Sequence, residues 1–168
     1  MFKKEYLSSY IKSAVISTIL FAIPMIVFLK SADYHNTYWL YVGNFLFLLS
    51  IAVFVLSFNK DKGENASTQT LRAAGHIATF FGILLSVVVA TIALVIFVPD
   101  IFSSGQSDTV LENAPSVTGA GKTHGMVFML YMNTIIGNFC GGSIASILIP
   151  ITAKRNQTKD RNSEVLNN

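Results

Sequence analysis

The sequence predicts an all-α integral membrane protein: a four-helix bundle with up-down-up-down topology and both termini in the cytoplasm. Only 12% of its 168 residues are charged, about half the ~25% of a soluble domain. The charged residues are also unevenly distributed, because four long runs contain none of them: 13–29, 40–58, 73–99 and 125–153. Each run approaches or exceeds the ~20 apolar residues that a helix needs to cross a bilayer.

The basic residues predict how these helices are oriented. Apart from Lys30 and Lys122, every Lys and Arg lies before the first run, between the second and third, or after the fourth. Positive residues near span ends stay in the cytoplasm. We therefore expect a multi-pass protein of the cell inner membrane. The basic segments indicate topology and not a nucleic-acid site, since their spacing does not follow a phosphate backbone.

We expect a single membrane domain over residues 1–153. Its spans are predicted at about 11–29, 38–58, 72–98 and 125–153. An extracytoplasmic loop covers 99–124 and a cytoplasmic tail covers 154–168.

The first two spans should form an antiparallel hairpin. Pro24 removes one backbone hydrogen bond from the first span and favours a kink there. Only a short outer turn separates that span from the second. Asn44 lies about one turn inside the second span, within reach of interfacial water, so a structural role is favoured over a functional one.

The third span carries small residues every four positions along one side: Ala78, Gly82, Ser86 and Ala90. Such rows let helix backbones approach closely in lipid. His76 lies about one turn inside this span. An isolated histidine is more often a hydrogen-bonded interfacial residue than a proton relay, and haem held by two histidines would need a second one at similar depth.

The fourth span has two adjacent rows of small residues. The first row is Gly137, Gly141 and Ala145, and the second is Asn138, Gly142 and Ser146. Because the third and fourth spans are antiparallel neighbours, we expect their rows of small residues to pack tightly against each other.

Two asparagines also lie in the fourth span, Asn133 and Asn138. Asn138 is close to the bilayer midplane, where a bare amide costs about 2–7 kcal/mol. We therefore expect Asn138 to find a hydrogen-bonding partner inside the bundle. If the interior is wet instead, Asn138, Asn133, Asn44 and His76 are the candidates to line a polar path.

The residues that most catalytic sites need are missing from the spans. None of the four charge-free runs contains Asp, Glu, Lys or Arg, although ion-coupled pumps and exporters commonly use an intramembrane carboxylate. The lone Cys140 and scattered histidines do not form a metal cluster. Residues 119–123 resemble the end of a P-loop, but Ser116 stands where its first glycine belongs. We predict no enzyme, no cofactor and no nucleotide.

Two family resemblances can be stated. Residues 138–146 are similar to the broken-helix motif of small four-span fluoride channels, but that family's glycine-arginine motif is missing and small-residue packing explains the same residues. A proline-bearing first span, a second span bounded by 41–43 and 58–62, and a glycine-rich last span ending in Lys154-Arg155 resemble a domain-of-unknown-function family of four-span bacterial inner-membrane proteins. This resemblance implies the same topology and brings no assigned activity.

The favoured function is a non-enzymatic scaffold, an accessory subunit or a small homo-oligomer. The rows of small residues and the uncharged spans motivate it. Its partners are then the lipid bilayer and a second copy or another membrane subunit. The alternative is a channel or carrier for a small neutral or anionic solute. A third hypothesis makes the outer loop a sensor or binding patch.

Overall fold

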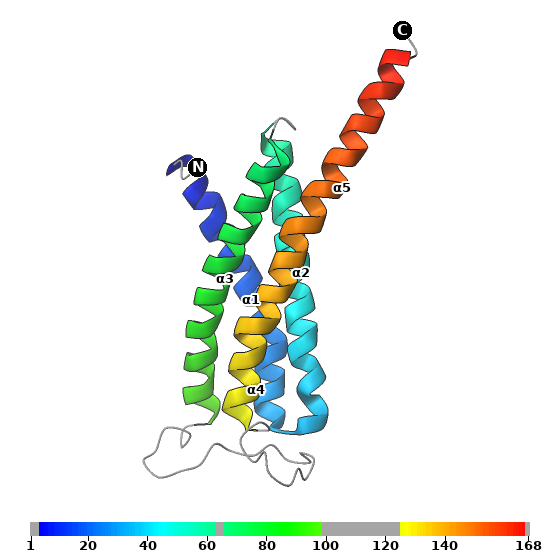
Figure 1. The fold of residues 1–168 in the computed structure, drawn as a ribbon. Coiled ribbons are helices and arrows are strands. Elements are labelled where there is room, and N and C mark those ends of the chain that lie inside the picture. Colours follow the sequence, from blue (N-terminus) through cyan, green and yellow to red (C-terminus); the bar gives the residue numbers. More distant parts are fainter. Residues whose placement is uncertain (1–3, 63–65, 99–124, 167–168) are drawn as a thin grey trace.

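The computed structural model describes residues 4–62, 66–98 and 125–166. The chain forms three long helices and a fourth rod built of three consecutive segments (Figure 1). The three long helices are α1 (Lys4–Ser31), α2 (Tyr38–Asp61) and α3 (Thr68–Phe97). The fourth rod consists of α4 (Met126–Met132), a π-helical turn (Asn133–Gly137) and α5 (Asn138–Leu166).

The four rods alternate in direction. α1 packs against α2 and α3, and α5 packs against the same two helices, so α1 and α5 occupy opposite corners. We call the end where α1 begins and α2 finishes the terminal end, and the end where α3 finishes and α4 begins the loop end. α1 begins and α5 ends on the side of the terminal end (Figure 1). The predicted up-down-up-down order is therefore present within the bundle.

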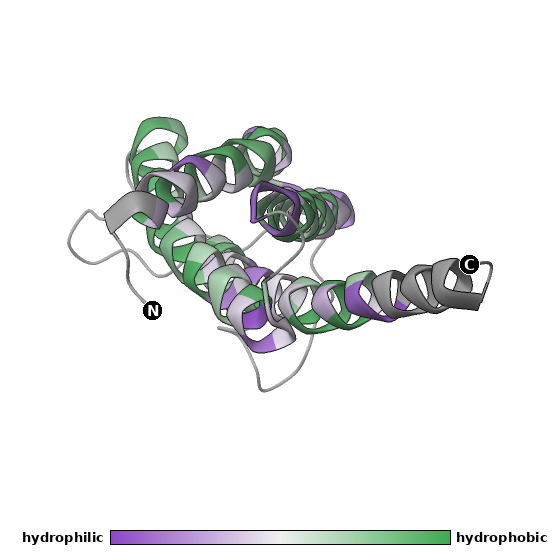
Figure 2. Cartoon of the chain, turned by 90° about the horizontal axis from the view of Figure 1, so that it is seen from above, coloured by the Kyte–Doolittle hydropathy of each residue, from purple (hydrophilic) through white to green (hydrophobic). Residues whose placement is uncertain are grey.

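The outer surface of the bundle is apolar. Large side chains such as Phe45, Phe80 and Phe139 are more than half exposed, and hydrophobic residues follow most of each helix (Figure 2). Exposed apolar surface on this scale marks contact with a membrane or a partner. In the part of the chain that the structure describes, four helices are long and apolar enough to span a bilayer: Tyr6–Ser31, Tyr34–Asp61, Thr68–Phe97 and Met126–Arg155. The chain is thus an all-α, multi-pass membrane protein with four candidate spans, which confirms that part of the prediction.

Short, hydrogen-bonded connections hold the helices together. Ala32 follows α1 with a left-handed φ of 49° and donates its N–H to the Phe28 carbonyl. A 3-10 turn (Tyr34–Thr37) then leads into α2, and the Asp33 carboxylate accepts the N–H of His35 at 2.8 Å. α3 starts at Ser67, whose hydroxyl accepts the Thr70 N–H at 3.1 Å and satisfies a free donor of the first turn.

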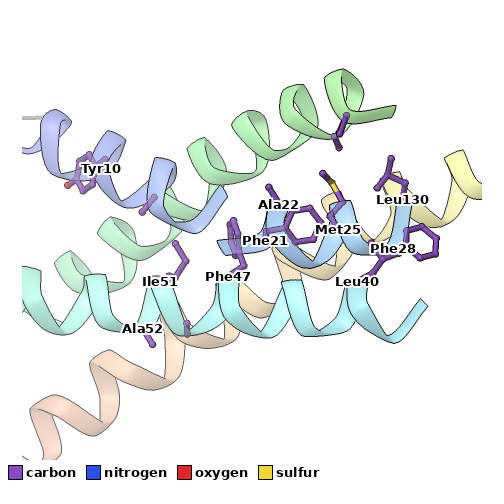
Figure 3. Packing of buried hydrophobic residues seen from close by; sticks show 14 of the residues in the cluster. Tyr10, Phe21, Ala22, Met25, Phe28, Leu40, Phe47, Ile51, Ala52 and Leu130 are labelled. Atoms are coloured by element: carbon purple, nitrogen blue, oxygen red, sulfur yellow. The ribbon is translucent and has the colours of Figure 1, made fainter. Parts of the chain in front are cut away.

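Large apolar side chains close both ends of the interior. Near the loop end, Phe28, Leu40 and Leu130 are fully buried and gather between the helices (Figure 3). Near the terminal end, the Tyr10 ring stacks on Phe58 with centroids 6.0 Å apart. The middle of the interior is built differently.

The fourth rod departs from the sequence prediction in two respects. The predicted single span contains a π-helical turn, and the predicted 154–168 tail is largely helical, because α5 continues to Leu166 and projects past the bundle (Figure 1). Extending a helix that already exists avoids the cost of nucleating a new one. A polar sequence can therefore stay helical beyond the apolar span.

Candidate functional site

Hydroxyl and amide side chains gather at mid-depth inside the bundle. On α1, α3 and the fourth rod, inward-facing positions change from large and apolar at the ends to small or polar in the middle. We call the buried polar residues of this region the polar layer. Its members are Ser13, Ser17, Thr18, Thr79, Ser86, Thr134, Asn138 and Ser146.

Several of these hydroxyls are satisfied by their own helix. In each case the hydroxyl donates to the backbone carbonyl of the residue four positions earlier, at 2.6–2.8 Å. The residues that do so are Ser17, Thr79, Thr134 and Ser146. This bond uses the one proton of the hydroxyl, which can then only accept a hydrogen bond from a ligand or a neighbour. Much of the polar layer therefore supports the helices.

Hydroxyls also connect neighbouring helices. The Ser17 and Ser50 oxygens lie 2.8 Å apart and connect α1 to α2. The Thr18 hydroxyl donates to the Gly82 carbonyl at 3.1 Å and accepts a bond from the Ser86 hydroxyl at 3.3 Å, connecting α1 to α3. Interhelical bonds of this kind hold helices together in lipid, where apolar burial contributes little.

Glycines bring α3 and α5 into close contact. A Cβ on Gly142 would overlap the Thr79 side chain, and a Cβ on Gly75 would lie 2.5 Å from Ser146 Oγ and 3.1 Å from Ser146 Cα. Both distances are shorter than van der Waals contact, so only glycine fits at these two positions. The row containing Gly142 and Ser146 therefore forms the α3 contact of α5.

The other rows of small residues face different helices, which departs from the expected ridge-to-ridge contact between α3 and α5. The α3 row Ala78, Gly82, Ser86 and Ala90 is buried. Its Gly82 lies against Phe47 of α2, and its Ser86 bonds to α1. Because α3 packs between α1 and α5, one side of the helix contacts α1 and another side contacts α5.

The α5 row Gly137, Gly141 and Ala145 also lies away from α3. A Cβ on Gly137 would overlap the Asn44 amide, and one on Gly141 would lie 3.3 Å from Leu48 Cβ, both on α2. Ala145 is 2% exposed. The rows of small residues therefore contact other helices of the same chain.

Two of the predicted path residues meet beside the π-helical turn. The Asn44 Nδ2 donates to Asn133 Oδ1 at 3.1 Å, and Asn133 Nδ2 donates to the Met129 carbonyl at 2.9 Å. The Asn138 N–H reaches back five residues to the Asn133 carbonyl, which defines the π turn. Such turns are rare and often found at functional sites.

Asn138 has the least satisfied side chain of the polar layer. It is fully buried, yet neither Oδ1 nor Nδ2 has a hydrogen-bond partner among the described residues. The expected partner is therefore missing from this part of the chain. The amide lies in a helix contact, and its burial without partners is unfavourable by about 1–3 kcal/mol.

The remaining candidate, His76, does not join this group. Its side chain is exposed on α3, whereas the asparagines lie inside the bundle or at its α2 interface. Within residues 4–62, 66–98 and 125–166, no three His, Cys, Asp or Glu side chains are grouped to hold a metal. The polar layer thus consists of neutral hydroxyls and amides. These groups form hydrogen bonds but do not take up or release a proton at neutral pH.

The sequence signals only part of this site. The four-residue spacing of Asn138, Gly142 and Ser146 places a row of small and polar residues on one face of the helix. The π turn has no comparable signal, and Thr79 and Thr134 resemble ordinary residues of an apolar span. Partners on other helices, such as Ser50 for Ser17, follow from the packing alone.

Comparison with protein-family models, curated proteins and solved structures finds no match to this chain. The resemblance to a four-span family stays a prediction. Conclusions about function therefore depend on the geometry of the polar layer and of α5.

Proposed function

We propose that this protein is a non-enzymatic accessory subunit or scaffold of the cell inner membrane, with both termini in the cytoplasm. The observation that carries the proposal is the continuation of α5 to Leu166, past the apolar run and the Lys154-Arg155 pair that follows it. Eleven further residues extend a helix by about 16 Å at 1.5 Å per residue. A helix of that reach outside the bundle offers a surface to another protein.

The charges of this projecting arm, residues 156–166, favour a protein partner over the membrane surface. Lys159 and Arg161 alternate with Asp160 and Glu164. Segments that bind anionic lipid carry clusters of basic residues, whereas mixed charges favour pairing with a complementary protein surface. We therefore propose that the arm binds a protein partner, either soluble or membrane-bound.

The closed interior supports the same proposal. Gly75, Gly82 and Gly142 bring neighbouring side chains into contact inside the bundle, and the Asn138 side chain is fully buried. A packed interior is what a structural subunit requires. Because the small residues pack within the chain, they lend no support to a homo-oligomer.

The arm is tested by cross-linking in native membranes. The full chain should give a discrete cross-linked product with another protein, and deletion of residues 156–168 should remove it. Replacing the same residues with an unrelated helix of equal length and net charge is the matched control. Loss of the product with the deletion and with the control supports recognition by the arm. An unchanged product after deletion contradicts it.

The orientation gives a second prediction. A reporter that is active only in the cytoplasm should be active when fused after Asn168 and inactive when inserted in the segment 99–124, because the basic residues keep the termini inside. Fusions of both kinds to a reporter active only in the periplasm are the control. Activity of the periplasmic reporter after Asn168 would refute the orientation.

A carrier for a small neutral solute is the second candidate function, and Asn138 is the observation that favours it. Its amide can both donate and accept hydrogen bonds, and the described structure uses neither capacity. The adjacent π turn provides a place where the fourth rod could change register. A state of the bundle that admits a solute would satisfy the amide.

A further inference from the structure

We propose that a groove between α1 and α2 binds one phospholipid with a zwitterionic, phosphoethanolamine-type headgroup. The groove has a volume of about 580 Å³, within the range of about 300–1,000 Å³ typical of ligand pockets. It opens on the outer surface of the bundle, where Ile16 and Val53 are more than half exposed. This inference does not depend on the function of the α5 arm.

The depth of each lining residue follows from the contact between Ser17 and Ser50, whose oxygens lie 2.8 Å apart. Measured from this level at 1.5 Å per residue, Lys12 lies about 7 Å, Ser57 about 10 Å and Asp61 about 16 Å toward the terminal end. All three line the groove. Its polar residues are therefore concentrated toward one end.

The rest of the groove is apolar. Its walls around and beyond the Ser17 level are made by Ile16, Leu20, Leu46, Leu49 and Val53. An acyl chain gains contact with such walls along its length, and each buried methylene contributes about 0.8 kcal/mol relative to water. The change from apolar to polar lining along one axis matches the two ends of a lipid.

The order of the charges selects the headgroup. Lys12 lies nearer the apolar walls, and its ammonium can extend outward, as lysines do at membrane interfaces, to meet a phosphate that follows the acyl chains. Asp61 lies farther out, where a headgroup ends in its own ammonium. Asp61 is the last residue of α2, and the dipole at a helix C-terminus favours a cation beside it. A phosphate with an outer primary ammonium satisfies both residues.

Hydroxyl groups complete this end of the groove. Ser9 and Ser57 line it between the levels of Lys12 and Asp61. Hydroxyls can donate to phosphate oxygens. The Ser13 hydroxyl below them is buried and has no partner within the described residues.

The experiment compares lipids on the full-length protein in mild detergent. Phosphatidylethanolamine, phosphatidylglycerol and phosphatidylcholine of identical acyl chains are added in turn, and the bound lipid is counted by native mass spectrometry. We expect one molecule of phosphatidylethanolamine to be retained at the lowest lipid concentration. Equal retention of all three lipids overturns the proposal.

Charge variants separate the two ends of the headgroup. Lys12→Gln should weaken retention of phosphatidylethanolamine about fivefold, which converts to about 1 kcal/mol for one basic residue at a membrane surface. Asp61→Asn should remove the preference over phosphatidylglycerol. Lys30→Gln is the matched control, because Lys30 lies near the loop end, with its ammonium 5.4 Å from the Phe97 ring centroid. Equal effects of Lys12→Gln and Lys30→Gln overturn the assignment.

A space-filling variant tests the groove itself. Ser57→Phe should reduce retention of the lipid, whereas Ser8→Phe should not, since Ser8 is exposed on α1 but does not line the groove. Both variants are also measured by light scattering. A change of oligomeric state with Ser57→Phe alone would show that a second chain occupies the groove, and would overturn the lipid assignment.

Discussion

Replacement of Gly142 by valine is expected to destabilise the bundle by about 3 kcal/mol or to prevent its folding. Even a Cβ at this position overlaps Thr79. Thr79 cannot easily turn away, because it is β-branched, 2% exposed and hydrogen-bonded to the Gly75 carbonyl at 2.8 Å. The helices must then separate, and overpacking of this kind typically costs about 1–3 kcal/mol. Thermal unfolding in detergent, followed by circular dichroism, measures the loss.

The control for this prediction is Cys140→Val, because Cys140 is exposed on the same helix and should tolerate the change. A double variant tests the contact directly. Thr79→Gly removes the overlapping side chain, so the Gly142→Val/Thr79→Gly protein should be more stable than additivity predicts, by about 1 kcal/mol or more. Strictly additive losses would contradict the contact between α3 and α5.

The sequence predicts the helices and their order because these follow from local properties. A run without charges predicts a span whatever its neighbours are. The described part of each run lies within one rod of the bundle or at its cap, with Val98 as the C-cap of α3 and Gly125 as the N-cap of α4. Ser67 is a recognisable cap for α3 for the same reason. The helical arm is less predictable, since it depends on propagation from a span and not on its own apolar pattern.

The candidate site is less predictable because it depends on pairing between helices. Rows of small residues show that close contacts exist, but a row such as Gly82 and Ser86 does not specify its partner. The structure pairs Gly82 with Phe47 and Ser86 with Thr18. A π turn adds one residue to a helical repeat, which rotates the residues before it relative to those after it. Spacing on an ideal helix therefore cannot relate Asn133 correctly to Asn138.

Replacement of Asn138 by leucine, a side chain of similar size, is expected to stabilise the folded bundle by about 1–3 kcal/mol. The wild-type amide is buried without partners, and removing an unsatisfied polar group removes its desolvation penalty. Asn133→Leu is the matched control and should have the opposite sign, because it removes the bond to the Met129 carbonyl and leaves Asn44 Nδ2 without the acceptor that now lies 3.1 Å away. Unfolding temperatures of the two variants in the same detergent give the comparison. A large destabilisation by Asn138→Leu would show that the amide has a partner in the membrane.

The same variant decides between the two candidate functions. An accessory subunit needs only the folded bundle and the arm, so Asn138→Leu should retain the cross-linked product of the arm and gain stability. A carrier needs the amide itself, because leucine can neither donate nor accept a hydrogen bond to a solute. Swelling of proteoliposomes in urea or glycerol measures this directly. If wild-type protein accelerates swelling and Asn138→Leu does not, the more stable protein is the less active one. Unsatisfied groups kept at the expense of stability are characteristic of working sites, and the carrier would then replace the scaffold as the function of the bundle.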